Sequence, residues 1–183
     1  MTDTVYVKGL AELQKFLDQL PAKIEKNIMR SALRAGAKVI LEEARARVPV
    51  STPNAKNQRL YGAYSGALRD SLRVTTRYSR GKITASVKAG GVTKRGADVF
   101  YAQWVEYGTR PHVITARNKG YLSFAGGAYK AVNHPGAQPR PFLRPAMDTR
   151  SHEAVIAVGR QIKARLTKAG IDTEEVTIGA DDL

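Results

Sequence analysis

The chain has 183 residues, of which 43% are hydrophobic and 25% are charged, values that are ordinary for one globular domain. It contains no cysteine, which excludes disulfide bonds and thiolate metal sites. The first ten residues carry no apolar run, and no segment approaches the roughly 18 apolar residues of a membrane span. We therefore expect a soluble protein that is made in the cytoplasm and has no membrane partner.

The net charge of +14 is concentrated in the middle of the chain. Residues 49–140 carry fifteen basic and three acidic side chains, a net charge of +12. A field of this size favours a polyanionic partner, most often nucleic acid. A basic surface that only keeps the protein soluble is an equally good interpretation of the charge alone.

The N-terminal part predicts two helices. Apolar residues recur at three- and four-residue steps over 10–20, and a longer helix follows over 21–48. Pro21 suits the first position of this helix, and Pro49 ends it because the residue before a proline avoids the α region. We expect the long helix to pack on the sheet. Its small residues would let another element approach closely: Ala32, Ala35, Gly36 and Ala37.

The next segment predicts a loop followed by a hairpin. Residues 50–64 are rich in turn formers and polar groups and predict an extended loop. A capped helical turn that begins at Ser65 leads into a strand over 72–78, and Arg80-Gly81 fits a hairpin turn. Residues 82–89 alternate, with Ile83, Ala85, Val87 and Ala89 facing inward and Lys82, Thr84, Ser86 and Lys88 facing outward.

The C-terminal half begins with a densely aromatic segment, 99–107, whose spacing predicts a short helix that stops at Gly108. A second extended loop is predicted at about 117–137, with β-like pieces at 113–116 and 121–124. A closing helix runs over about 145–168, and an acidic tail covers 171–183.

This order of elements, helices followed by strands and a final helix, indicates the α+β class. We expect a long N-terminal helix and a C-terminal helix packed on a small antiparallel sheet with long basic loops. All of these elements are expected in one domain over residues 1–170.

No recognisable catalytic or metal-binding motif is present in the sequence. His112, His134 and His152 are isolated, and none stands at metal-ligand spacing from another. Serine-hydrolase, P-loop and dinucleotide-binding motifs are missing, as are zinc-finger and RNA-binding signatures. We therefore expect no enzyme activity, no cofactor and no metal. Contacts with nucleic acid are expected to involve phosphates rather than base edges.

Three segments together point to a family. The first is Val7-Lys8-Gly9-Leu10 with the alanine-rich helix that ends in Arg47-Val48-Pro49. The second is a Gly-x-Leu-x-x-Ser step at 66–71 followed by YAQWVEYGT at 101–109, and the third is PRPFLRPAM at 139–147. In this order they resemble the head–tail joining proteins of long-tailed bacteriophages, also called neck or tail-completion proteins. The resemblance covers about residues 5–168.

The resemblance implies a non-catalytic subunit of the phage neck, assembled in the host cytoplasm and present in the virion. It implies a homo-oligomeric ring whose channel passes the genome, with non-specific DNA contact. The partners would be connector or head-completion proteins on one side and tail-tube or tail-terminator proteins on the other. A sequence-independent nucleic-acid-binding module is the alternative function, and a nuclease or other enzyme is a third.

Two sets of residues follow as candidates for the site and the core. Basic side chains are candidates for a DNA channel or a subunit interface: Lys56, Arg59, Lys94, Arg95, Arg117, Lys119, Lys130, Arg140 and Arg144. Large apolar side chains are the predicted core anchors: Phe100, Trp104, Tyr107, Phe142 and Leu143. Tyr101 is expected near a subunit boundary.

Overall fold

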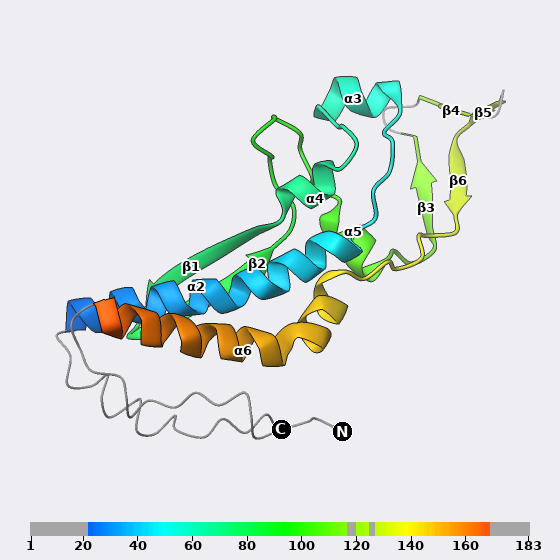
Figure 1. Cartoon of the computed structure of the whole chain (residues 1–183). Helices are drawn as coiled ribbons and strands as arrows, with labels where there is room; N and C mark the ends of the chain where they lie inside the picture. The colour runs from blue at the N-terminus through cyan, green and yellow to red at the C-terminus, as the bar shows by residue number, and fades with distance from the viewer. Residues whose placement is uncertain (1–21, 117–119, 125–126, 169–183) are drawn as a thin grey trace.

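The computed structural model describes residues 22–116, 120–124 and 127–168 (Figure 1). The predicted helix over 10–20 and the predicted acidic tail lie outside these ranges. The α+β class is confirmed. The elements are α2 (Ala22–Arg47), α3 (Ala55–Tyr61), α4 (Ala67–Ser71), β1 (Arg73–Ser79), β2 (Lys82–Lys88), α5 (Ala102–Tyr107), β3 (His112–Thr115), β4 (Leu122–Phe124), β5 (Gly127–Tyr129), β6 (Ala131–His134) and α6 (Leu143–Lys168).

The two long helices, α2 and α6, lie side by side and run in opposite directions (Figure 1). They lie close together at Gly36, where a Cβ atom would lie 2.6 Å from Val158 Cγ2 and 2.7 Å from the Ala154 carbonyl oxygen. A cluster of buried apolar residues joins their outer halves: Ile28, Ala32, Ile162 and Leu166. The predicted close approach of another element is confirmed, and at Gly36 that element is α6. Helix α2 also packs against strands β1 and β2, as expected.

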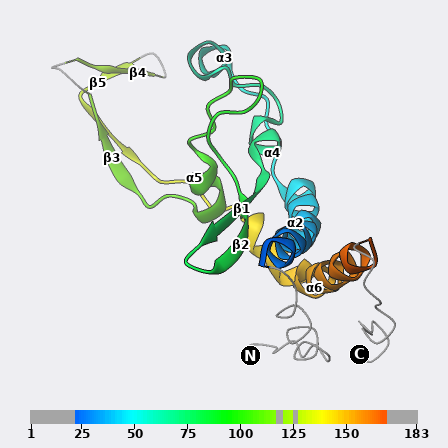
Figure 2. The ribbon, with the colours of Figure 1, turned by 90° about the vertical axis from the view of Figure 1, so that its left-hand side faces the viewer.

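Strands β1 and β2 form the predicted antiparallel hairpin. The turn residues Arg80 and Gly81 have φ values of 51° and 76°, and a type I′ turn requires positive φ at both positions. Val74 pairs with Val87, and both pack against the core on the side of the hairpin that faces α2. Figure 2 shows α2 lying between the hairpin and α6.

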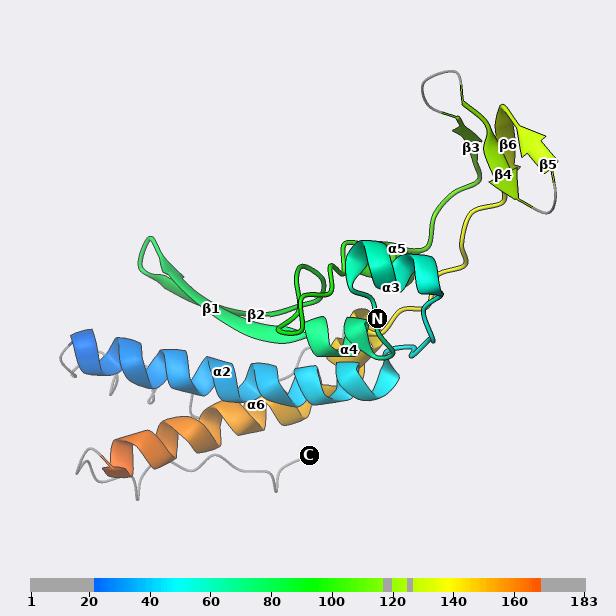
Figure 3. The same ribbon diagram turned by 90° about the horizontal axis from the view of Figure 1, so that it is seen from above.

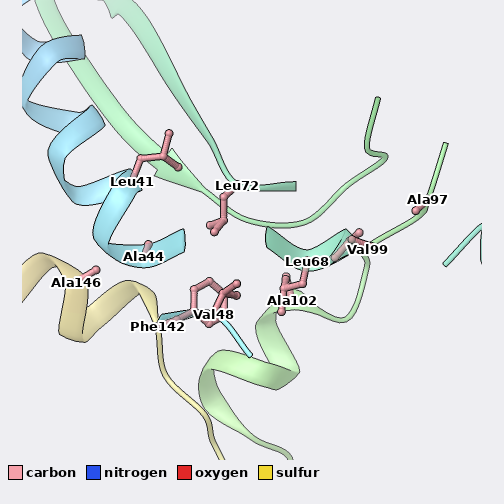
Figure 4. Close-up of a cluster of buried hydrophobic side chains, with 11 residues drawn as sticks. Leu41, Ala44, Val48, Leu68, Leu72, Ala97, Val99, Ala102, Phe142 and Ala146 are labelled. Carbon is pink, nitrogen blue, oxygen red and sulfur yellow. The ribbon is translucent and has the colours of Figure 1, made fainter. Parts of the chain in front are cut away.

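The main hydrophobic core lies where the end of α2 meets α4, α5 and the start of α6 (Figure 4). Phe142 is fully buried in this cluster together with Val48, Leu68 and Leu72. Burying one such side chain stabilises the fold by about 1.5–3 kcal/mol. The closing helix begins at Leu143, directly after this anchor, so α6 starts two residues earlier than predicted.

Two segments predicted as extended loops contain regular structure. Helix α3 lies inside the predicted loop 50–64, capped by the Asn54 side chain, which accepts a 2.8 Å hydrogen bond from the Asn57 N–H. No residue of α3 is buried, so the helix leaves no apolar periodicity in the sequence. The predicted loop 117–137 contains β4, β5 and β6, which we had not predicted beyond the piece at 121–124.

Candidate functional site

Helix α5 is joined to α6 by a single buried carboxylate. Glu106 is 5% exposed, and its side chain accepts hydrogen bonds from three successive backbone N–H groups at the start of α6. The distances are 2.8 Å from Phe142, 2.9 Å from Leu143 and 3.0 Å from Arg144. The first N–H groups of a helix have no partner within the helix and carry a partial positive charge. Glu106 therefore caps α6 from a different element, 36 positions before Phe142 in the chain.

Backbone contacts extend this junction on both sides. The Arg140 N–H donates to the Val105 carbonyl oxygen at 2.8 Å, and Thr109 and Ala137 exchange two backbone hydrogen bonds. Gly108, which directly precedes Thr109, has a φ of +70°, and a Cβ atom there would lie 2.5 Å from the Ala137 carbonyl oxygen. The YAQWVEYGT and PRPFLRPAM segments are thus one structural unit, although 29 residues separate them in the chain.

The aromatic side chains of the first segment are on the surface, so their prediction as core anchors was wrong. Phe100 is 44% exposed, Trp104 46% and Tyr107 68%. Ala102 and Glu106 occupy the buried side of α5 instead. Phe100 precedes α5 and contacts Trp104, and both rings, like that of Tyr107, are exposed. Periodicity identifies a common face and does not say which face is buried.

These exposed rings form an aromatic patch with a side chain from α3. The Phe100 ring lies 5.2 Å from Tyr61, 5.8 Å from Tyr101 and 5.5 Å from Trp104, centroid to centroid. Tyr101 is half-buried, and burial raises the pKa of its hydroxyl. The patch, defined as Tyr61, Phe100, Tyr101 and Trp104, is the largest group of contacting aromatic rings in the described ranges. Exposed apolar groups of this kind are typical of interaction surfaces.

Four of the predicted basic candidates lie on two neighbouring segments. Lys56 and Arg59 belong to α3, and Lys94 and Arg95 belong to the loop after β2. The Tyr61 carbonyl oxygen accepts a hydrogen bond from the Asp98 N–H at 2.9 Å, which holds α3 beside this loop. Lys130 belongs to another part of the fold, the connection between β5 and β6. Arg117 and Lys119 lie outside the described residues.

The remaining candidates flank the start of α6. Arg140 and Arg144 are both exposed, and neither forms an ion pair within the described parts of the chain. The Arg144 guanidinium lies over the Tyr107 ring, 5.9 Å from its centroid. Phe142 is buried, whereas Leu143 is partly buried at the edge of the core.

Strands β3, β4, β5 and β6 form an arm that projects from the body (Figures 1 and 3). β3 pairs with β6 at the base of the arm, and β4 pairs with β5 at its tip. Apolar side chains on the arm are exposed, including Val113 at 59% and Tyr121 at 63%. His112 and His134, isolated in sequence, face each other across the β3–β6 pair, with ring centroids 5.1 Å apart.

The described residues include neither a metal-ligating cluster nor a membrane-spanning helix. They contain no group of three or more His, Asp or Glu side chains that could hold a metal ion. Their helices include none that is long and apolar enough to cross a membrane. What the described surface offers is an arm, an aromatic patch and exposed basic side chains, features of a protein that works in contact with other macromolecules.

The family comparison gives the particular class. Residues 11–108 match the family described as "Bacteriophage HK97-gp10, putative tail-component", a match that covers more than half of the chain. The protein belongs to this family and has a structural role in a phage tail. No curated protein sequence and no solved structure matches the chain at a significant level.

Proposed function

We propose that this protein is a non-catalytic subunit of the phage neck, forming a homo-oligomeric ring that joins the head connector to the tail and lets DNA pass. Its family membership supports a structural role in the tail. The ring, the connector and head-completion partners, and the tail-tube or terminator partners are the finer parts of the proposal. Assembly would take place in the host cytoplasm, and the finished ring would be part of the virion.

The arm is the observation that carries the ring proposal. A two-stranded ribbon is marginally stable in water unless a further surface supports it. Here β3 pairs only with β6 and β4 only with β5 in the described structure, and the Val113 and Tyr121 side chains remain 59% and 63% exposed. A neighbouring copy of the chain could cover these groups and pair with the open strand edges.

A ring also needs a receiving surface for each arm. The aromatic patch is suited to this role, because clustered exposed rings are characteristic anchors of protein interfaces. A contact between the arm of one copy and the patch of the next is heterologous, and such contacts produce closed rings when the rotation closes. In the proposed ring, each subunit boundary is formed by the arm of one copy and the aromatic patch of the next.

Native mass spectrometry and electron microscopy of the purified full chain test this proposal. We expect a large symmetric assembly with a central channel. A variant in which residues 112–134 are replaced by a short Gly-Ser linker should remain monomeric, with a far-UV circular dichroism spectrum that retains the helical signal. A variant that keeps the arm but carries Val113→Ser and Tyr121→Ser should assemble more weakly. Wild-type protein that stays monomeric at all concentrations, or unimpaired assembly without the arm, would overturn the proposal.

A free-standing, sequence-independent nucleic-acid-binding module is the alternative, supported by the net charge of +12 on residues 49–140. Such a module would stay small until nucleic acid is added, whereas the ring would form without it. The same native mass measurement, made with and without short duplex DNA, therefore separates the two functions.

A further inference from the structure

The solvent-facing side of the β1–β2 hairpin is a continuous basic surface. The strand register places Thr75 opposite Ser86, Arg77 opposite Thr84, and Ser79 opposite Lys82. These pairs lie on the face that points away from α2, because Val74 and Val87 occupy the other face. Together with Arg80 and Lys88 they line a shallow concave surface. We call this surface the basic hairpin face.

The charge on this face is of one sign. The hairpin, residues 73–88, contains five basic residues and no acid. Arg73 is engaged, because its guanidinium donates to the carbonyl oxygens of Ser71 and Gly90. In contrast Arg77, Arg80, Lys82 and Lys88 form no ion pair with any acid of the described ranges. Four cations are thus presented to solvent on a rigid, hydrogen-bonded ribbon.

The residue types on the face indicate what it binds. Between the cations lie the hydroxyls of Thr75, Thr84 and Ser86, and arginine, lysine, serine and threonine are the side chains that contact phosphate oxygens in nucleic acid. The face carries no large apolar side chain, whereas protein interfaces depend on apolar or aromatic anchors. It carries no aromatic ring either, and proteins that bind single strands use such rings to stack bases.

We infer that the basic hairpin face binds the phosphate backbone of duplex DNA without reading its sequence. A strand of seven residues is about 20 Å long, a length over which one strand of B-DNA presents about six phosphates. The hairpin lies on the same side of α2 as the arm, away from α6 (Figures 2 and 3). This inference deepens the proposed function, since it names the surface through which the ring would meet the DNA that it passes.

The salt dependence of DNA binding tests the inference. Fluorescence anisotropy would measure the affinity of the full chain for two short duplexes of unrelated sequence, between about 50 and 200 mM salt. The variant carries Arg77→Gln and Lys82→Gln. Its matched control carries Arg160→Gln and Lys163→Gln, two exposed cations of α6, which lies on the other side of α2. Circular dichroism establishes that both variants are folded.

We expect equal affinity for the two duplexes and a wild-type slope of log affinity against log salt that is clearly negative. In the hairpin variant the slope should become less negative by about 0.9 for each phosphate contact removed, and by up to about 1.8 for both. The α6 control should keep the wild-type slope. Equal losses in both variants would mean that only net charge matters and would overturn the inference. An unchanged slope in the hairpin variant would overturn it as well.

Native mass spectrometry of the same samples separates this inference from the proposed function. If rings form normally and the hairpin variant keeps the wild-type salt dependence of DNA binding, the proposed function stands and the inference about the hairpin face is wrong. If the hairpin variant shows a weaker salt dependence but the protein never forms rings, the hairpin face binds DNA and the ring proposal is wrong. A hairpin variant with unchanged DNA binding that fails to complete phage particles would overturn the inference in favour of an acidic protein partner.

Discussion

Glu106 shows how a charged side chain can be part of the core. Removing a carboxylate from water is costly unless hydrogen bonds and opposite charge compensate for it. The three N–H groups at the start of α6 provide both, because they donate hydrogen bonds and carry the positive end of the helix dipole. A residue that in sequence is one of three scattered acids in a basic region is therefore the link between two helices.

The first prediction is that Glu106→Gln destabilises the fold by about 1–3 kcal/mol, because the amide NH₂ would face a backbone donor and leave it unsatisfied. Urea unfolding followed by circular dichroism measures the free energy of unfolding. The control is Glu153→Gln, which removes an exposed ion pair with Arg150 and should change stability by less than about 1 kcal/mol. Equal stability of wild type and Glu106→Gln would show that the cap contributes nothing.

Glu43 forms one ion pair within α2, with Arg47, and one that connects α2 to α6, with Arg150. Its carboxylate accepts a hydrogen bond from Arg47 Nε at 2.6 Å and one from Arg150 Nε at 3.0 Å. The pKa of Glu43 is lowered below its usual value, mainly by the hydrogen bond from Arg150 and to a smaller extent by the hydrogen bond from Arg47. Because the folded-state pKa is the lower one, the contribution to stability is present above the usual pKa of the carboxyl and is lost as the pH falls through the folded-state pKa.

The second prediction follows from that sign. Between about pH 6 and pH 3 the Tm of the wild type should fall further than the Tm of Glu43→Gln, since the variant has no carboxylate to protonate. The neighbouring Glu42→Gln is the control, because Glu42 is exposed and pairs with no cation in the described ranges. Thermal unfolding at a series of pH values gives the comparison. Parallel curves for wild type and Glu43→Gln would contradict the prediction.

At the scale of elements, α5 is a helix with its large side chains on the outside. The buried side carries Ala102 and Glu106, and the core beneath it is filled by Phe142 from the segment that leads into α6. Core packing and surface exposure are thus divided between different aromatic residues. Phe142 is fully buried in the core, whereas Phe100 and Trp104 remain exposed on the surface.

The third prediction compares the two kinds of aromatic residue. Phe142→Ala should cost about 3–5 kcal/mol of unfolding free energy, because it empties a fully buried site. Trp104→Ala should cost much less, about 1 kcal/mol, since the residue is 46% exposed and its ring stacks edge-on against the exposed Phe100. Under the proposed function, Trp104→Ala should nevertheless weaken ring assembly. Denaturant unfolding and native mass spectrometry measure the two effects, and a large stability loss in Trp104→Ala would contradict this separation.

At the scale of the whole molecule, the described residues form a compact body and a projecting arm (Figure 3). The body contains both hydrophobic clusters, while the arm exposes apolar and basic side chains that include Val113 and Lys130. The junction of arm and body is the unit of α5 and the start of α6, where Glu106, Gly108 and Thr109 make their contacts. A substitution beside this junction can therefore affect both the arm and the body.

The fourth prediction concerns Arg144, which is exposed beside the junction. Arg144→Glu should reduce assembly of the full chain by placing an acid where a basic side chain would meet a neighbour, while the monomer stays folded. Since the new carboxylate would lie near Glu106, the neutral variant Arg144→Gln is needed as well, and it should show a smaller loss of assembly. Arg160→Glu on α6 is the control for charge reversal itself. Unaltered assembly in both Arg144 variants would remove this residue from the interface.

The sequence by itself determined the elements whose buried faces leave a pattern. Apolar spacing predicted the long helix now seen as α2, strict alternation predicted β2, and Arg80-Gly81 predicted the turn, because each of these signals arises from local geometry and one-sided burial. The family resemblance, carried by short motifs, was also available from sequence and agrees with the family match over 11–108. Helix α3 left no such signal because it buries nothing.

Only the tertiary structure decided which side of each element faces inward and which distant residues meet. The rings at 100, 104 and 107 were predicted to be buried because they are large and apolar, yet Phe142 from another segment fills the core. The partner of Glu106 is 36 residues away, and the basic hairpin face exists only because α2 covers the opposite side of the ribbon. Burial depends on competition among all elements for one core, and local spacing carries no information about that competition.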